Sequence, residues 1–219
     1  MHKIERLAKS HDRDGFDCGS EPLNLFLQQT ARQHAERGIS RTFVLVDEAA
    51  TMPKPIIGFF SLNICQIKAE SLTAQAARKL PRDVAGVRLG RLAVSKACQR
   101  QGIGKTLLVA AMGKFIAIFN SAGGIGLFVD AKDQAAKRYY EQFGFVSLPS
   151  NELELFLPVK TIQEALNLKT AVNAKTPRGK DAEERGETQR KRTLCESLRL
   201  CVKSSPPASK AGYSRERDL

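Results

Sequence analysis

The sequence has no tryptophan, and aromatic residues make up only 6% of its 219 positions. It has no uninterrupted apolar run near the roughly 20 residues that span a membrane, and its polar N-terminus lacks the apolar core of a secretory signal. We therefore expect a cytoplasmic protein without a membrane partner. The cysteines are odd in number and follow no metal-ligand spacing, which predicts reduced thiols and no metal site. They are Cys18, Cys65, Cys98, Cys195 and Cys201.

Acidic side chains are in the minority, with 23 Asp and Glu against 35 Lys and Arg and a net charge of +12. The basic surplus is present both up to Lys160 and after it. Such a surplus suits a polyanionic partner such as a nucleic acid, but it also serves solubility alone. Composition leaves both explanations open.

Hydrophobic patterning stops near residue 170. The remaining sequence is charged and rich in turn-forming residues, a composition that cannot bury enough apolar surface to fold. We therefore expect one domain over residues 1–168 and a basic, disordered extension over residues 169–219.

Hydrophobic periodicity predicts alternating strands and helices within this domain. The expected helices cover residues 20–38, 70–81, 105–119 and 132–145, and the expected strands cover residues 41–48, 55–68, 87–94, 123–131 and 151–159. Ser20 is expected to cap the first helix, with Pro22 in its first turn and Gly38 at its end. The first two strands should form an antiparallel hairpin with a bulge at Gly58. This order indicates an α/β (α+β) protein with a mixed sheet.

A glycine-containing loop joins the strand at residues 87–94 to the apolar helix that follows. It reads "CQRQGIGK", in which one residue separates Gly102 from Gly104. Backbone N–H groups at a helix start lack partners, and the helix dipole adds about half a positive charge there. Glycines let a phosphate approach closely, and Arg100 and Lys105 add charge. The loop is a candidate phosphate site, although a tight turn alone would also explain two glycines.

Two common phosphate loops do not match this pattern. The dinucleotide fingerprint needs a third glycine where this chain has Leu107, and the P-loop needs four residues between its glycines. The remaining pattern, Gln-x-x-Gly-x-Gly between a strand and a helix, resembles the coenzyme A pyrophosphate loop of GNAT-type N-acetyltransferases. The element order and the later stretch "AKRYYEQFGF" are also similar to that family. This resemblance implies the GNAT fold, with a mostly antiparallel central sheet flanked by helices, and acetyl-CoA as acetyl donor.

Three stretches narrow the resemblance to one branch of the family. "FDCGSEPLNLFLQQTARQHAERG", "LGRLAV" and "AKRYYEQFGF" are similar to GNAT toxins of type II toxin–antitoxin pairs, over residues 4–168. The resemblance implies transfer of acetyl to the α-amino group of aminoacyl-tRNA, which blocks translation. It also implies a ribbon–helix–helix antitoxin, through which the pair binds and represses its operator DNA. Such toxins often form homodimers.

The resemblance assigns the acetyl-CoA site to two neighbouring segments. The end of a strand, at Leu92, Ala93 and Val94, would pair with the pantetheine arm. The pyrophosphate would bind Arg100, Gln101, Gly102, Ile103, Gly104 and Lys105. For Lys105, a solvated lysine in the first helical turn is the simpler alternative.

Acetyl transfer to an amine needs a free amine, a stabilised oxyanion and a proton for the leaving thiolate. Helical phase does not choose a proton donor between Tyr139 and Tyr140, because an alanine lies one turn before each. The family pattern places the catalytic tyrosine directly before Glu141, at Tyr140, and gives Tyr139 a packing role. No general base is evident, since Asp130 at a strand end is more simply solvated. An α-amine titrates near about 8 rather than the roughly 10.4 of lysine, so an α-amine acceptor depends less on a base.

Basic residues flank the expected groove in the sequence. Arg78, Lys79, Arg82, Arg88 and Arg91 precede the loop, and Arg37 and Arg41 lie beside the first strand. We expect them to contact RNA phosphates, and Arg91 foremost because it adjoins the substrate end of the strand. A solvated basic face is the alternative for each.

Two other functions remain open from the sequence. A protein or small-amine N-acetyltransferase would share the fold and the donor site. A non-catalytic acyl-CoA-binding regulatory module would share the donor site alone.

Overall fold

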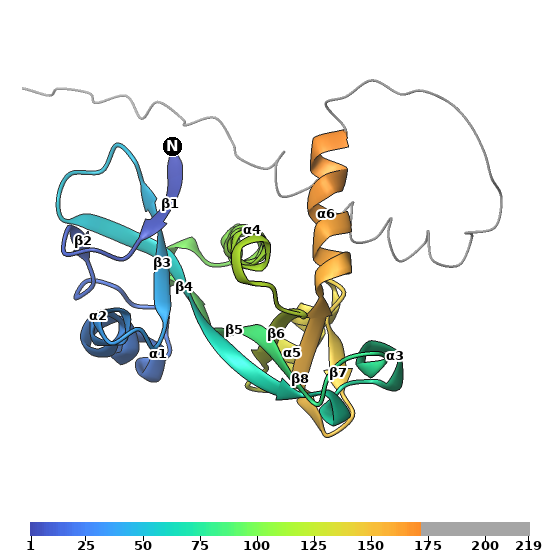
Figure 1. Ribbon diagram of the computed structural model, residues 1–219. Coiled ribbons are helices and arrows are strands. Elements are labelled where there is room, and N and C mark those ends of the chain that lie inside the picture. The colour runs from blue at the N-terminus through green and yellow to red at the C-terminus, as the bar shows by residue number, and fades with distance from the viewer. Residues whose placement is uncertain (172–219) are drawn as a thin grey trace, which may run out of the picture.

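A mixed sheet of eight strands forms the centre of the computed structural model, which describes residues 1–171 (Figure 1). The strand order is β1-β3-β4-β5-β6-β8-β7, with β2 paired to β4. The strands are β1 His2–Arg6, β2 His11–Asp12, β3 Arg41–Asp47, β4 Lys54–Lys68, β5 Asp83–Val94, β6 Gly126–Asp130, β7 Val146–Leu148 and β8 Asn151–Pro158. Among these strands only β2–β4 and β5–β6 are parallel pairs, so the sheet is mostly antiparallel, as predicted. The extension expected at residues 169–219 lies almost entirely outside the described residues.

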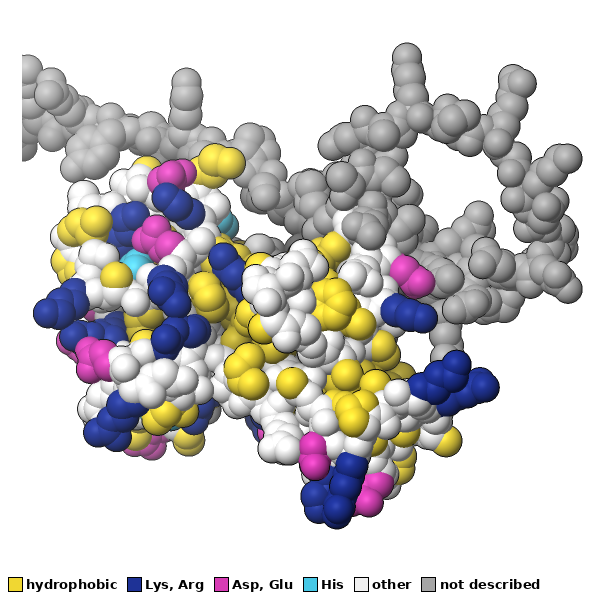
Figure 2. Space-filling view, in the orientation of Figure 1, with side chains coloured by type: hydrophobic (Ala, Val, Ile, Leu, Met, Phe, Trp, Pro, Cys, Tyr) yellow, Lys and Arg dark blue, Asp and Glu magenta, His cyan; other side chains and the backbone are white. Residues whose placement is uncertain are grey.

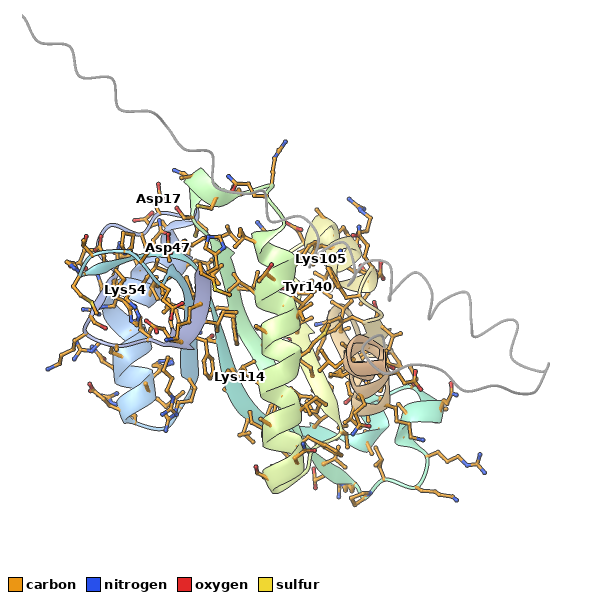
Figure 3. The ribbon with its side chains drawn as sticks, turned by 90° about the horizontal axis from the view of Figure 1, so that it is seen from above. Asp17, Asp47, Lys54, Lys105, Lys114 and Tyr140 are labelled. Carbon is orange, nitrogen blue, oxygen red and sulfur yellow. The ribbon has the colours of Figure 1, made fainter. Side chains whose placement is uncertain are left out.

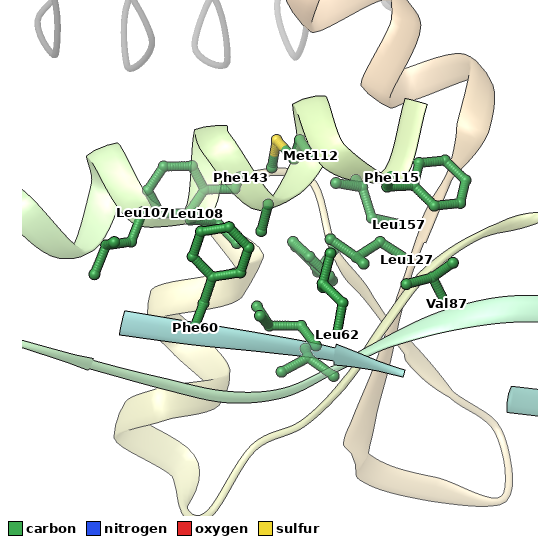
Figure 4. Packing of buried hydrophobic residues seen from close by; sticks show 14 of the residues in the cluster. Phe60, Leu62, Val87, Leu107, Leu108, Met112, Phe115, Leu127, Phe143 and Leu157 are labelled. Carbon is green, nitrogen blue, oxygen red and sulfur yellow. The ribbon is translucent and has the colours of Figure 1, made fainter. Parts of the chain in front are cut away.

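Helices cover both faces of this sheet. They are α1 Glu21–Leu25, α2 Ala31–Glu36, α3 Ala74–Ala77, α4 Ile103–Ala122, α5 Gln134–Glu141 and α6 Val159–Ala171. α4 buries Leu107 and Phe115 against one face, with Leu107 near Phe60 of β4 and Phe115 toward Val87 of β5 (Figure 4). The segment of α1 and α2 packs Phe26 on the opposite face, against Phe59. Alternate residues of β4 therefore supply the two separate cores.

α4 is long and apolar enough to cross a membrane by length and composition alone. Its side chains Leu107, Leu108, Met112 and Phe115 are fully buried in the protein (Figure 4). An apolar stripe of this kind is what a helix needs to cover a sheet. The packing of α4 on the sheet thus accounts for its hydropathy.

The first predicted helix forms as three consecutive pieces, α1, a π-helical turn at Phe26–Thr30 and α2. Pro22 lies in its first turn, and Gly38 follows its end with a φ of 74°, as predicted. The expected cap is wrong in one respect, because the Ser20 side chain makes no capping hydrogen bond. The predicted hairpin of β3 and β4 is confirmed, with a shift of register beside Gly58.

The helix predicted at residues 70–81 is present only at Ala74–Ala77, so its predicted length is wrong. The chain forms a 3-10 turn at Ala69–Ser71 and then the single turn of α3. Arg78 leaves the helical region with a ψ of 124°, and Lys79 adopts a φ of 64°, so the helix cannot continue. Leu72 and Leu80 belong to a cluster with β5, β6 and β8. Burial of these leucines outweighs helix propensity here.

The strands β1 and β2 are absent from the sequence prediction because their residues are polar. β1 pairs with β3 along its whole length. His11 of β2 anchors this edge: its Nδ1 accepts the Ala8 N–H at 2.9 Å, so its Nε2 carries the proton and donates to Glu5 Oε1 at 2.8 Å. The His11 side chain is only 1% exposed. A buried polar contact, rather than an apolar pattern, holds these strands in place.

Replacing His11 by alanine is expected to lower the free energy of unfolding by about 2 kcal/mol, because the Ala8 N–H loses its acceptor and the Glu5 carboxylate keeps only its longer contacts with Lys54 and Lys3. Denaturant unfolding followed by circular dichroism measures this. The matched control is His2→Ala, at an exposed position of β1, which should stay within about 0.5 kcal/mol of the wild type. Equal stability of the two variants would show that His11 does not anchor the edge.

Candidate active site

The sheet opens between β5 and β6, and this opening positions the site. The two strands are parallel but pair at three positions, of which the last is Leu89 with Val129. A bulge follows at Gly90, where the pairing with β4 skips one residue. Bulges increase local twist. Over residues 91–94, β5 is paired with β4 alone among the described strands, so its other edge has no strand partner there, and its Val94 carbonyl accepts a hydrogen bond from the Gln99 side chain.

The loop after β5 adds unpaired amides to this opening. Gly102 is the N-cap of α4 with a φ of 78°, a left-handed conformation that favours glycine. The N–H groups of Ile103 and Gly104 have no backbone acceptor within residues 1–171, as expected for a first helical turn. Arg100 and Lys105 flank them, and neither forms a salt bridge in that part of the chain. Amides, helix dipole and cations together favour an anion at this point.

Seven of the nine residues predicted to bind acetyl-CoA line one groove with a volume of about 420 Å³. They are Leu92, Val94, Arg100, Gly102, Ile103, Gly104 and Lys105. Two lie elsewhere: the Ala93 side chain is buried on the opposite face, and Gln101 is exposed and donates to the Ala97 carbonyl at 3.1 Å. Sequence reasoning missed four lining residues: Gln99 in the loop, Tyr139 of α5, and Gln142 and Phe143 directly after α5.

The two adjacent tyrosines of α5 have different surroundings. Tyr139 lines the groove, and its Oη lies 3.2 Å from the position that a Cβ on Gly104 would take. Tyr140 packs edge-on to Tyr139 and against Phe145, with ring centroids 5.4 and 5.5 Å away. Burial raises the pKa of Tyr140 to about 12, so its hydroxyl stays protonated at neutral pH. Figure 3 labels Tyr140 and Lys105 toward the N-terminal end of α4. The catalytic role of Tyr140 stays a prediction.

The residues predicted to bind RNA do not gather in one patch. Arg78, Lys79 and Arg82 lie at and after the end of α3, whereas Arg37 and Arg41 follow α2, and these two helices lie at opposite ends of the sheet (Figure 1). Arg41 is half-buried and donates to the Ala35 carbonyl. Figure 2 shows Lys and Arg side chains mainly over the part of the surface formed by β1, β2, α1 and α2.

Arg88 is held in an ion-pair network at the base of the opening. It pairs with Asp130 of β6 and with Glu154 of β8, the latter at 2.6 Å. The network links three strands where the sheet begins to separate. Asp130, which the sequence analysis considered as a general base, forms an ion pair with Arg88. Two carboxylates already compensate the charge of the Arg88 guanidinium. Its contact with RNA stays a prediction.

Arg91 differs from Arg88 because it forms no salt bridge within residues 1–171. Its guanidinium lies over the Phe26 ring, with the central carbon 3.7 Å from the ring centroid. Partial burial lowers its pKa. The side chain thus presents a cation on the face of the sheet opposite to α4, beside the open edge of β5.

An open strand edge that leads into an anion site fits a donor with an extended amide arm and a pyrophosphate, as in acetyl-CoA. Together with Tyr139 in the groove and Tyr140 packed against it, this arrangement defines an acyl-CoA-dependent N-acetyltransferase. The chain belongs to the GNAT acetyltransferase family, since the model of the acetyltransferase (GNAT) domain matches residues 38–147.

The chain is similar to toxins of this family. A tRNA-acetylating toxin of Mycobacterium tuberculosis is 28% identical over 155 residues, which are 71% of this chain and 90% of that protein. A crystal structure of a tyrosine-to-phenylalanine mutant of KacT has a TM-score of 0.70 and 32% identity, covering 74% of this chain and 98% of that one. AtaT complexed with acetyl-methionyl-tRNAfMet has a TM-score of 0.69 and 32% identity over the same shares. The resemblance stated from the sequence is confirmed.

Proposed function

We propose that this protein transfers the acetyl group of acetyl-CoA to the α-amino group of an aminoacyl-tRNA and thereby blocks translation. The observation that carries the proposal is the open edge of β5, which leads into the amides of Ile103 and Gly104 in one groove. The acceptor is supported by the relatives, one of which is named a tRNA-acetylating toxin and another of which is solved with acetyl-methionyl-tRNAfMet. A protein with this substrate would act in the cytoplasm.

The chemistry needs placement and one proton donor. The neutral α-amine attacks the thioester carbonyl, the C–S bond breaks, and Tyr140 donates a proton to the departing thiolate. The nitrogen then loses a proton to water, and the Tyr140 phenolate takes a proton back from solvent. The ordinary pKa of an α-amine, about 8, leaves a neutral fraction for the attack without a dedicated base. Residues 91–94 would hold the pantetheine arm, and the amides of Ile103 and Gly104 would hold the pyrophosphate with Arg100 and Lys105.

Incubation with labelled acetyl-CoA and separate acceptors tests this function. We expect label in charged tRNA, recovered as N-acetyl amino acid after mild base, and none in uncharged tRNA. Label in a peptide or polyamine but not in charged tRNA would make the protein the alternative kind of N-acetyltransferase. Acetyl-CoA binding without transfer to any of them would favour the non-catalytic regulatory module.

We also infer a ribbon–helix–helix antitoxin as partner, with operator DNA reached through the antitoxin. This is supported by AtaT bound to the C-terminus of its antitoxin AtaR and by a KacTA complex with DNA. Light scattering on the protein alone and with the product of the neighbouring gene would measure both this complex and a homodimer.

Replacing Arg91 by alanine is expected to raise KM for charged tRNA about 10-fold and to leave the Kd for acetyl-CoA unchanged. The cation stacked on Phe26 is available for a phosphate of the acceptor, and its loss removes about one charged contact. Arg91→Lys keeps the charge but loses the planar stack, so it should recover the affinity in part. The control is Lys68→Ala, at an exposed position at the end of β4. Equal losses for charged tRNA and acetyl-CoA would assign Arg91 a role in the fold instead.

A further inference from the structure

The stretch "FDCG", residues 16–19, helped to place the chain in its family but has no part in the proposed function so far. None of its side chains lines the acetyl-CoA groove. Phe16 is buried, with its ring edge-on to Phe59 at 5.4 Å, and so fixes the stretch to the core between α1 and the sheet. The next three residues lie against the loop that follows β5.

Two of these residues hold the loop through both backbone and side-chain contacts. The Asp17 carbonyl accepts the Lys96 N–H at 2.8 Å, and the Asp17 carboxylate pairs with the Lys96 ammonium at 2.7 Å. The Cys18 carbonyl accepts a hydrogen bond from the side-chain amide of Gln99 at 2.9 Å. The same Gln99 amide donates to the Val94 carbonyl at 3.0 Å. The contacts thus reach the loop from its beginning to the residue before Arg100.

The Asp17 carboxylate is itself held in place by its own segment. One oxygen accepts the Gly19 N–H at 2.8 Å and the Asn24 side-chain amide at 2.9 Å, which leaves the other oxygen for Lys96. Gly19 has a φ of 84°, and a Cβ there would come within 3.0 Å of Lys96 Cε. The Lys96 hydrogen bond, followed by those from Gly19 and Asn24, lowers the pKa of Asp17 to about 2. The carboxylate is therefore charged at every pH used for an assay.

We propose that Asp17 is a positioning residue for acetyl-CoA: it latches the loop at residues 95–99 so that the following amides point at the pyrophosphate. The inference deepens the proposed function and rests on it for the identity of the donor. Amides recognise an anion only when their N–H bonds converge on it, and Gln99, the last residue of the latched loop, lies four residues before Ile103. Figure 3 labels Asp17 away from Lys105 and Tyr140, at the far side of this loop.

An exposed ion pair alone contributes little to stability, and both side chains of the pair are more than half exposed. A latch role therefore predicts an effect on the donor that exceeds the effect on the fold. It also predicts that the effect is confined to the part of the donor that contacts the loop.

Replacing Asp17 by alanine is expected to weaken acetyl-CoA binding about 5- to 10-fold by calorimetry, with a Tm close to that of the wild type. At saturating acetyl-CoA, kcat should be unchanged. With acetyl-pantetheine as donor, which has no pyrophosphate, kcat/KM should change less than about twofold. Asp17→Asn keeps an acceptor for the Gly19 N–H but loses the charge toward Lys96. Its Kd for acetyl-CoA should lie between that of the wild type and that of Asp17→Ala. The control is Asp14→Ala, an exposed carboxylate in the same segment.

Equal losses with acetyl-CoA and acetyl-pantetheine, or an acetyl-CoA Kd equal to that of Asp14→Ala, would overturn the latch. Failure of the proposed function looks different, because the wild type itself would then fail to bind acetyl-CoA or to acetylate charged tRNA. The calorimetric measurement needs no acceptor, so it separates the two results.

Discussion

Replacing Tyr140 by phenylalanine is expected to lower kcat about 10²- to 10⁴-fold, the range for loss of a general acid. The change removes one oxygen and keeps the ring that packs against Tyr139 and Phe145. Burial raises the pKa of Tyr140 to about 12, so the phenol is protonated and able to donate at all pH values below that. The measurement is a single-turnover rate of acetyl transfer to charged tRNA, with the Kd for acetyl-CoA determined on the same protein. That Kd should be unchanged.

Tyr139→Phe is the matched control, because it makes the same change one residue earlier in α5. Tyr139 lines the groove near Gly104, so its loss should act on donor binding, by about threefold or less, and not on kcat. A larger fall in kcat for Tyr139→Phe than for Tyr140→Phe would transfer the role of proton donor to Tyr139. The structure makes this comparison necessary, since the family pattern alone gave Tyr139 only a packing role.

Replacing Gly102 by glutamate is expected to weaken acetyl-CoA binding by at least about 100-fold, which corresponds to about 2.7 kcal/mol. The new carboxylate would lie at the N-terminus of α4, where it competes with the pyrophosphate for the free amides. The φ of 78° adds backbone strain for any residue with a Cβ. Calorimetry with acetyl-CoA measures the effect.

Gly102→Ala separates charge from strain. A Cβ at this position meets no atom within 4 Å, so Gly102→Ala should lower the free energy of unfolding by about 1–2 kcal/mol through backbone strain alone. It should weaken acetyl-CoA binding only slightly. If Gly102→Ala and Gly102→Glu weaken acetyl-CoA binding equally, the affinity depends on the conformation of the loop and not on an anion site. Unchanged binding in Gly102→Glu would remove the pyrophosphate from this loop altogether.

Sequence patterns predicted most of the central strands because each carries a run or an alternation of buried apolar residues. β3, β4, β5, β6 and β8 all lie where the periodicity placed them. The N-terminal strand β1 was missed because it is an edge strand with polar residues, held by pairing and by the contact of His11 with Glu5. The full helix expected at residues 70–81 does not form. Local propensity favours a helix there, but the burial of Leu72 and Leu80 in the core requires a non-helical backbone on both sides of α3.

The candidate donor site was largely predictable from the sequence. The free amides at the start of α4 follow from a strand, two glycines and a helix in succession, and this is a local property of the chain. The basic residues were less predictable, because charge in a sequence carries no information on its partners. Arg88 is compensated by Asp130 and Glu154, whereas Arg91 lies over Phe26 with no such partner in residues 1–171.

By itself, the sequence determined the five strands β3, β4, β5, β6 and β8, the candidate phosphate-binding loop and the family. The strands and the loop depend on residues within about one helical turn or one strand of each other, and the family follows from three such local stretches. Only the tertiary structure decided that β5 leaves its edge open after a bulge at Gly90, that Tyr139 lines the groove, and that Asp17 holds the loop through Lys96. These features depend on strand register and on contacts between segments far apart in the chain, which short-range periodicity does not encode.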